Sequence, residues 1–151
     1  MIVEGIRYTS VESEGGLNQM DAAVVTPLAR SGDTSGAYSL FEVRDAPGGG
    51  PPLHRHSRED EAFYVLEGEY EVHSQDGLVT RAGPGTYVFV PRGTVQAYKC
   101  VGPGQGRMLV MASPGGLEVF FEALSKVDGG DFAAVAAVAA ANGIEVVGPP
   151  V

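Results

Sequence analysis

The feature that most constrains the fold of this chain is a series of short β-rich runs separated by glycine- and proline-containing turns. The runs are rich in branched and aromatic residues, which favour strands. We expect strands at 2–8, 22–28, 37–43, 61–66, 69–74, 78–82, 86–90, 94–101 and 107–113. Many short strands at regular spacing are typical of antiparallel sandwiches and barrels, so the sequence predicts an all-β fold.

Turn residues predict how some of these runs connect. The pair Asp76-Gly77 is a strong signal for a β-hairpin. Gly68 forms a tight turn between the run before it and the run after it. Pro27 lacks the backbone N–H that a central strand needs, so it places its run at a sheet edge or at the end of a strand.

The last part of the chain changes to a helical pattern. Residues 117–126 carry apolar side chains at three-to-four spacing, and residues 132–141 are rich in alanine. Asp131 stands at the N-cap position of the second segment, and Asn142 with the following glycine ends it. We expect both helices to pack across one end of the sheet. The prediction is a single domain over 1–151, with a barrel core at about 20–113 and a helical segment at about 117–143.

The charge composition of the chain disfavours some classes of binding partner. The chain has 19 acidic and 10 basic residues, a formal net charge of −9, and no cluster of Lys and Arg. Such a surface disfavours nucleic acid and anionic membranes. The single cysteine, Cys100, excludes an internal disulfide and is expected to be an inert, partly buried thiol. With no signal peptide and no membrane span in the sequence, we expect a cytoplasmic protein.

Two of the three histidines lie one residue apart, as His54 and His56. On a strand their side chains share a face, so they form half of a shell for a divalent transition metal. Glu61 stands at an odd spacing from His56, and a turn at 57–60 would let it join them from a new strand. We expect the neighbouring Glu59 and Asp60 to be surface carboxylates. His73 lies apart from these residues and is also expected at the surface.

The spacing of these residues resembles the two motifs of the cupin superfamily. The first, G-x5-H-x-H-x4-E-x6-G, runs in full from Gly48 to Gly68, and the second begins as G-x5-P-x-G from Gly85 to Gly93. The chain is similar to small single-domain bacterial cupins related to quercetin 2,3-dioxygenase. The resemblance implies an antiparallel jelly-roll β-barrel with two short C-terminal helices, a homodimer, and a metal held by His54, His56 and Glu61.

The second motif departs from the cupin pattern at the fourth metal ligand. Where the family has histidine, this chain has Gln96. An amide oxygen is a weaker donor than imidazole toward transition metals, so Gln96 is expected either to ligate weakly or to bind a metal-bound water. Two histidines and one carboxylate are also the ligands of non-haem iron oxygenases. The expected cofactor is therefore Fe, Ni or Mn, with Zn also open, or no metal if the site is degenerate.

Three functions remain open at this point. The first is a metal-dependent, dioxygenase-like enzyme acting on a small enolisable aromatic or flavonol- or polyketide-like molecule, with Glu61 as catalytic base. The second is a non-oxidative isomerase, cyclase or decarboxylase of natural-product biosynthesis, with weak or no metal. The third is a non-catalytic domain that binds a small molecule.

Strand alternation predicts which side chains line the pocket of such a protein. If Gln96 points inward, Thr94 and Tyr98 do so too, and Phe63 follows Glu61 in the same way. These three residues are the expected contacts to a small-molecule substrate. Tyr98 is the best candidate for a hydroxyl that reaches the substrate.

Overall fold

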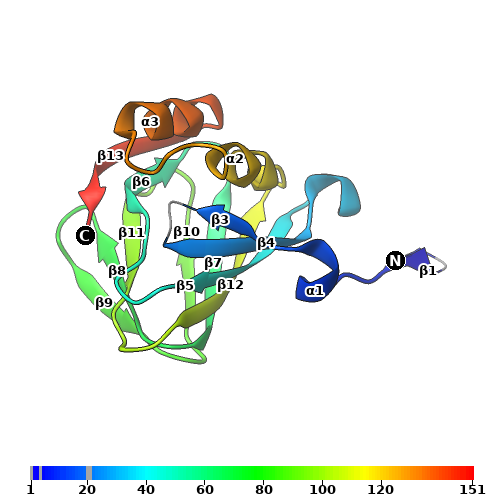
Figure 1. Ribbon diagram of the computed structural model, residues 1–151, viewed down its shortest axis with the longest axis horizontal. Coiled ribbons are helices and arrows are strands. Elements are labelled where there is room, and N and C mark those ends of the chain that lie inside the picture. The colour runs from blue at the N-terminus through cyan, green and yellow to red at the C-terminus, as the bar shows by residue number, and fades with distance from the viewer. Residues whose placement is uncertain (1, 4, 20–21) are drawn as a thin grey trace.

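The computed structural model describes residues 2–3, 5–19 and 22–151, and its main feature is a pair of antiparallel β-sheets with two helices at one end (Figure 1). The six-stranded sheet contains, in order, β10 (Tyr87–Val90), β7 (Asp60–Glu67), β12 (Gly106–Ser113), β5 (Ser39–Asp45), β4 (Ala23–Ala29) and β3 (Leu17–Gln19). The five-stranded sheet contains β13 (Ile144–Pro150), β6 (Pro52–His56), β11 (Gln96–Cys100), β8 (Tyr70–Ser74) and β9 (Val79–Ala82).

The remaining elements are short. A small hairpin of β1 (Ile2–Val3) and β2 (Ile6–Arg7) extends from the body and is followed by α1 (Val11–Glu14) (Figure 1). A 3-10 turn, η1 (Ser31–Asp33), precedes β5, and two longer helices, α2 (Leu117–Leu124) and α3 (Phe132–Ala141), follow β12. None of the described helices is long and apolar enough to cross a membrane.

The core lies between the two sheets. Phe63 and Val110 from the six-stranded sheet meet Tyr70 and Cys100 from the five-stranded sheet in one buried cluster. Residues of β12 alternate between buried and less buried positions, because successive side chains of a strand point to opposite faces. The predicted all-β jelly-roll fold is therefore confirmed. Cys100 is fully buried, and burial raises the pKa of its thiol.

The two C-terminal helices are confirmed near their predicted bounds. The Asp131 side chain accepts a hydrogen bond from the Ala134 backbone N–H at 3.1 Å, as an N-cap should, and Asn142 is the C-cap. Helix α2 packs on the sheet through Phe121, whose ring lies 4.9 Å from that of Phe41. Both helices cover the same end of the sheets (Figure 1).

The strands and their connections agree with the prediction in part. The run at 2–8, predicted as one strand, is the hairpin of β1 and β2. The hairpin at Asp76-Gly77 joins β8 to β9 as expected. The turn at Gly68, however, joins strands of different sheets, so β7 and β8 do not pair. Gly68 adopts φ +83°, and a Cβ there would lie 2.8 Å from Cα of Gly106, so glycine lets the chain cross over closely. Strands β3 and β13 lie outside the predicted runs.

Pro27 lies inside β4 but avoids the central pairing that it could not make. Strand β3 pairs only with residues 23–25 of β4, so β4 has no neighbour on that side at Pro27. On the other side, the register with β5 shifts between Pro27 and Ala29. The residue thus combines the two positions that a strand proline tolerates, an edge and a bulge.

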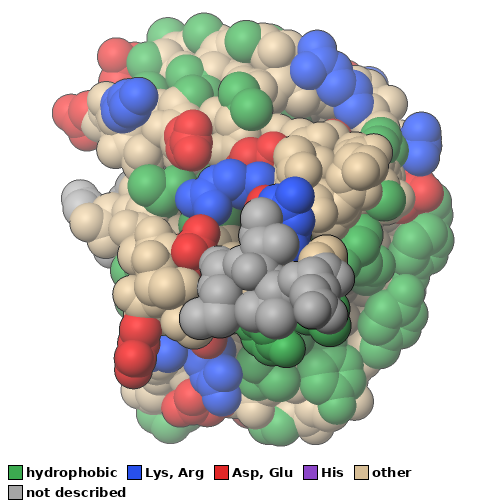
Figure 2. Space-filling model, turned by 90° about the vertical axis from the view of Figure 1, so that its right-hand side faces the viewer, with side chains coloured by type: hydrophobic (Ala, Val, Ile, Leu, Met, Phe, Trp, Pro, Cys, Tyr) green, Lys and Arg blue, Asp and Glu red, His purple; other side chains and the backbone are tan. Residues whose placement is uncertain are grey.

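The outer surface mixes charges and carries some apolar residues. Figure 2 shows acidic and basic side chains next to one another on one face, with hydrophobic side chains gathered at its lower right. Ion pairs such as Arg7–Asp33 and Arg30–Glu14, at 2.9 and 2.8 Å, are partly exposed and contribute little to stability.

Candidate metal centre

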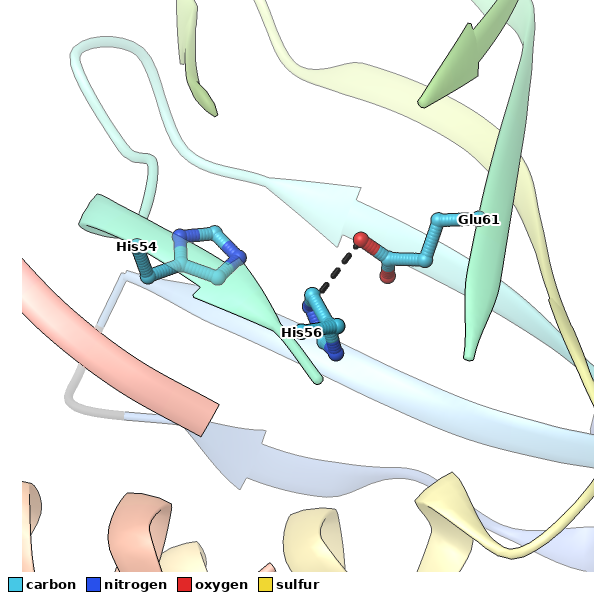
Figure 3. A group of neighbouring side chains, drawn as sticks. All are labelled: His54, His56 and Glu61. Carbon is cyan, nitrogen blue, oxygen red and sulfur yellow. Dashed lines mark ion pairs between the residues drawn. The ribbon is translucent and has the colours of Figure 1, made fainter. Parts of the chain in front are cut away.

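The residues of the first motif converge from both sheets. His54 and His56 lie on β6 of the five-stranded sheet, whereas Glu61 lies on β7 of the six-stranded sheet. The turn between these strands brings the three side chains toward one another (Figure 3). Their ligand atoms all lie within 4.8 Å of one another, and all three residues are buried. The predicted half-shell of two histidines and one carboxylate is therefore formed.

Hydrogen bonds to the outer ring nitrogens set the orientation of both imidazoles. Nδ1 of His54 lies 2.7 Å from the carbonyl oxygen of Pro52, which can only accept, so this nitrogen carries the proton. Nδ1 of His56 lies 2.7 Å from Oε1 of Glu59. Each ring therefore keeps Nε2 for the cluster: Nε2 of His56 lies 3.0 Å from Oε1 of Glu61, and Nε2 of His54 lies 3.3 Å from the Gln96 amide nitrogen. Metal-binding histidines adopt this arrangement when a carbonyl or carboxylate holds the other nitrogen.

Glu59 corrects the prediction of a surface carboxylate. Its side chain is buried, with 5% of its surface exposed, and its carboxylate forms a hydrogen bond with Nδ1 of His56. The residue stands three positions after His56, and the turn folds back so that the carboxylate meets Nδ1. A carboxylate shortly after a motif histidine is a sequence signal for such a partner, but its burial depends on packing that periodicity does not reveal.

Gln96 joins the cluster from the neighbouring strand β11, where it pairs in register with His54. Its amide nitrogen lies 3.3 Å from Nε2 of His54 and 3.2 Å from Oε1 of Glu61. Its amide oxygen is buried and has no hydrogen-bond partner among the described residues. In this orientation the amide nitrogen faces the cluster, and the oxygen would reach a cation there only after the amide turns over. Two imidazoles and one carboxylate are by themselves a donor set compatible with a divalent metal.

The charges in the cluster are strongly coupled. Burial opposes a charge on His56, but the carboxylates of Glu61 and Glu59 outweigh it and raise the His56 pKa to about 10. Burial alone would raise the pKa of Glu61, yet His56 and His54 lower it overall. Burial lowers the pKa of His54. One buried imidazolium thus lies between two carboxylates, and a cation that takes its place at Nε2 would release that proton.

A cavity of about 110 Å³ opens beside the cluster. Its walls are mostly apolar and come from both sheets, from the two C-terminal helices and from β13. Phe63 and Tyr98 line it as predicted, with their rings 5.6 Å apart. Thr94 does not: it is exposed and lies in the turn before β11 begins at Gln96, so strand alternation does not extend to it.

We expect Glu59→Gln to weaken metal binding without removing the ligands. The amide still reaches Nδ1 of His56 but no longer carries the negative charge that makes the imidazole a better donor. Loss of such a partner typically costs about 10- to 100-fold in metal affinity. Titration of the purified protein with Ni²⁺ or Mn²⁺ would measure this, and Glu67→Gln, at an exposed position further along β7, is the matched control. Equal affinity in both variants would contradict the assignment.

Solved structures with this architecture belong to several enzymes. The polyketide cyclase RemF from Streptomyces resistomycificus is 25% identical over 72% of this chain and 79% of its own, with a TM-score of 0.62. KdgF from a Halomonas species is 19% identical over 72% and 93%, with a TM-score of 0.64. A predicted oxalate decarboxylase from Thermotoga maritima is 17% identical over 72% and 99%, with a TM-score of 0.66.

Comparison of the sequence with protein-family models agrees with this structural likeness. No curated protein matches the chain. Residues 41–112, which contain the whole His54–Glu61 cluster and Gln96, match the family model of the cupin domain. The narrower resemblance to quercetin dioxygenases stays a prediction. From the motif, the jelly-roll architecture and this match, residues 41–112 of the chain form a cupin domain.

Proposed function

We propose that this cupin is a metal-dependent enzyme that converts a small, mostly apolar, enolisable aromatic or polyketide-like molecule in a dioxygenase-like reaction. The observation that carries the proposal is the orientation of both histidines, each held at Nδ1 so that Nε2 is left for the cluster, with the ligand atoms of His54, His56 and Glu61 within 4.8 Å of one another. Two histidines and one carboxylate leave coordination positions open for other ligands. The apolar cavity beside them is suited to a substrate with few polar groups.

His54, His56 and Glu61 would hold the metal, with the Gln96 amide oxygen as a weak fourth donor. A bound Fe, Ni or Mn would act as a Lewis acid on an enolate and allow chemistry with dioxygen. The other roles fall to the chain. Oε1 of Glu61 lies 3.0 Å from Nε2 of His56, and this carboxylate would accept the substrate's hydroxyl proton. Phe63 and Tyr98 would orient an aromatic ring and exclude water.

A second candidate is a non-oxidative cyclisation or isomerisation in natural-product biosynthesis. Gln96 favours it, because a weak fourth donor suits proton-transfer chemistry that needs little from a metal. The likeness to the polyketide cyclase RemF, at 25% identity, points the same way. In this case Glu61 and His56 would move the proton between them, as base and acid.

Oxygen uptake separates the two candidates. Protein loaded with Fe²⁺, Ni²⁺ or Mn²⁺ would be incubated with flavonols and with aromatic polyketides, with and without air. Dioxygen consumption in step with substrate loss supports the first proposal, whereas turnover that is equal without air supports the second. A protein that binds these compounds but leaves them unchanged, in the parent chain and in Glu61→Gln alike, would overturn both and leave a binding domain.

Gln96→His tests whether the amide is a weakened ligand. Because imidazole is a stronger donor than an amide oxygen, we expect metal affinity to rise about tenfold or more. Metal content after dialysis, measured by mass spectrometry, gives the result, and His73→Gln on strand β8 of the same sheet is the control. If Gln96→His lowers metal content in a folded protein, the amide has a role that histidine cannot fill.

A further inference from the structure

The cavity is short of hydrogen-bond donors. Among the described residues, three buried side-chain polar atoms have no partner: Oε1 of Gln19, Oδ1 of Asp45 and Oε1 of Gln96. All three residues line the same cavity, and all three atoms are oxygens. A buried acceptor without a donor costs free energy, and proteins seldom leave one unless a ligand or water fills the need. Gln96 belongs to the candidate metal centre, so Gln19 and Asp45 are the acceptors for which the cavity's ligand must supply a donor.

Asp45 is far from the candidate metal centre. On strand β12, Ala112 pairs with Glu61 and Gly106 pairs with Asp45, six residues further along. At about 3.3 Å per residue, this is roughly 20 Å of strand. Tyr98 lies within electrostatic range of both carboxylates. Burial raises the pKa of its hydroxyl, and the charges of Asp45 and Glu61 raise this pKa further. The cavity thus has a second polar position, separated from the first by mostly apolar walls.

The Asp45 side chain is fixed in place. Its exposed fraction is 1%, and the Tyr70 hydroxyl donates to its Oδ2 at 2.6 Å. Gly106 leaves room for this tyrosine, since a Cβ there would lie 2.3 Å from the Tyr70 hydroxyl oxygen. Gln19 is held in a similar way, with its amide nitrogen 3.0 Å from the Phe121 carbonyl oxygen. In both residues one polar atom is anchored and the other is left without a partner.

We propose that Asp45 recognises a hydroxyl group of the cavity's ligand through its unpartnered Oδ1, at the end of the ligand that lies away from His54 and Glu61. This rests on the proposed function in so far as that ligand is the substrate. The ligand is therefore a mostly apolar ring system with a hydroxyl group on its distal part, and Gln19 offers a second acceptor for such a group.

The chemistry of Asp45 favours a hydroxyl over other groups. Burial raises its pKa to about 7, so acid and carboxylate are both populated near neutral pH. A hydroxyl donates to the carboxylate and accepts from the acid, so it pairs with either form. A ligand carbonyl would pair with the acid alone, and a ligand carboxylate would be repelled by the ionised form.

Matched naphthalenes test this without turnover and without metal. The probes are 2-naphthol and 2-methylnaphthalene, which carry a hydroxyl and a methyl group at the same ring position, titrated calorimetrically into the parent protein after treatment with a chelator. A hydrogen bond to a charged or partly charged group gives about tenfold or more, so 2-naphthol should bind at least that much more tightly. In Asp45→Leu this advantage should disappear, while Asp128→Leu at an exposed position should keep it.

Equal affinity of the parent protein for the two naphthalenes would overturn the proposal. So would an unchanged advantage in folded Asp45→Leu. If Asp45→Leu does not fold, Asp45→Asn is the second variant: its amide lacks the negative charge that strengthens a hydrogen bond, so the advantage of 2-naphthol at pH 8 should be smaller than in the parent, and an equal advantage would overturn the proposal. Because no metal is present, failure of the metal-dependent function would leave these results standing, and the reverse also holds.

Discussion

His54→Ala should abolish stoichiometric metal binding, with affinity at least about 100-fold below that of the parent protein. The imidazole supplies Nε2 to the cluster, and its outer nitrogen bonds only to the Pro52 carbonyl, so removing it leaves no buried charge without a partner. His56→Ala would be a poorer test, because it leaves the carboxylates of Glu59 and Glu61 buried without their cation. Equilibrium dialysis against Ni²⁺ or Mn²⁺, followed by mass spectrometry, measures the effect.

His73→Ala is the matched control for this experiment. His73 lies on β8, partly exposed, where Nε2 is 3.1 Å from Glu71 Oε2. Its removal should leave metal content unchanged. If His54→Ala, folded by circular dichroism, keeps as much metal as His73→Ala, the cation is bound elsewhere and the candidate metal centre is wrong.

Asp45 should make the free energy of unfolding fall as pH rises from 4 to 8, opposite to the contribution of carboxylates whose pKa is lowered in the folded protein. Its folded pKa of about 7 lies above the value of about 3.9 expected in the unfolded chain. In that interval the folded protein holds a proton that the unfolded chain has released, so raising the pH favours unfolding. At about 1.4 kcal/mol per pH unit, the contribution is on the order of 4 kcal/mol.

Asp45→Asn isolates this contribution, because its amide keeps the size of the side chain and does not titrate. The titratable groups facing Asp45 are Tyr70, Tyr98 and Cys100; burial raises the pKa of each, so they stay neutral over this range. Urea unfolding at several pH values should show the parent losing stability relative to Asp45→Asn as pH rises.

The control for this prediction is Asp76→Asn. Asp76 is exposed, and hydrogen bonds from the Ser74 hydroxyl and the Leu78 backbone N–H lower its pKa. Its contribution to the free energy of unfolding therefore changes with pH in the opposite direction to that of Asp45. The stability of the parent relative to Asp76→Asn should not fall with rising pH. Parallel curves for the parent and Asp45→Asn would show that Asp45 is ionised throughout and that its burial costs less than we infer.

The candidate metal ligands could be predicted because their spacing follows local rules. His54 and His56 alternate along one strand, and the turn before Glu61 restores an inward direction that the odd spacing would otherwise forbid. Gln96 was found through its place in the second motif, and it pairs with His54 in the structure. Each of these inferences needs only the backbone period and a short stretch of sequence.

Residues whose role depends on packing from distant segments could not be predicted in this way. Glu59 is buried with its carboxylate on His56, and Asp45 is buried with its carboxylate on the hydroxyl of Tyr70, 25 positions later. Neither contact leaves a periodic pattern. The exposure of Thr94 shows the same limit, since alternation holds only while the chain remains a strand.

The same is true of the topology. The runs around Gly68 look like a hairpin, yet the chain passes from one sheet to the other there. Short-range turn chemistry specifies that the chain reverses, while the choice of partner strand depends on which apolar faces meet. Strand β13 is a further case: it pairs with β6, about ninety residues earlier, and so flanks the strand that carries both histidines.

The origin of the ligands on two sheets has a mechanical consequence. A cation held by residues of β6 and β7 would cross-link the two sheets, so the sheets could not separate without releasing it. Heat or denaturant would then have to release the cation before the core could open. Tight metal binding would therefore slow unfolding and also raise the temperature or denaturant concentration at its midpoint. Thermal resistance would thus report on occupancy even before any substrate is known.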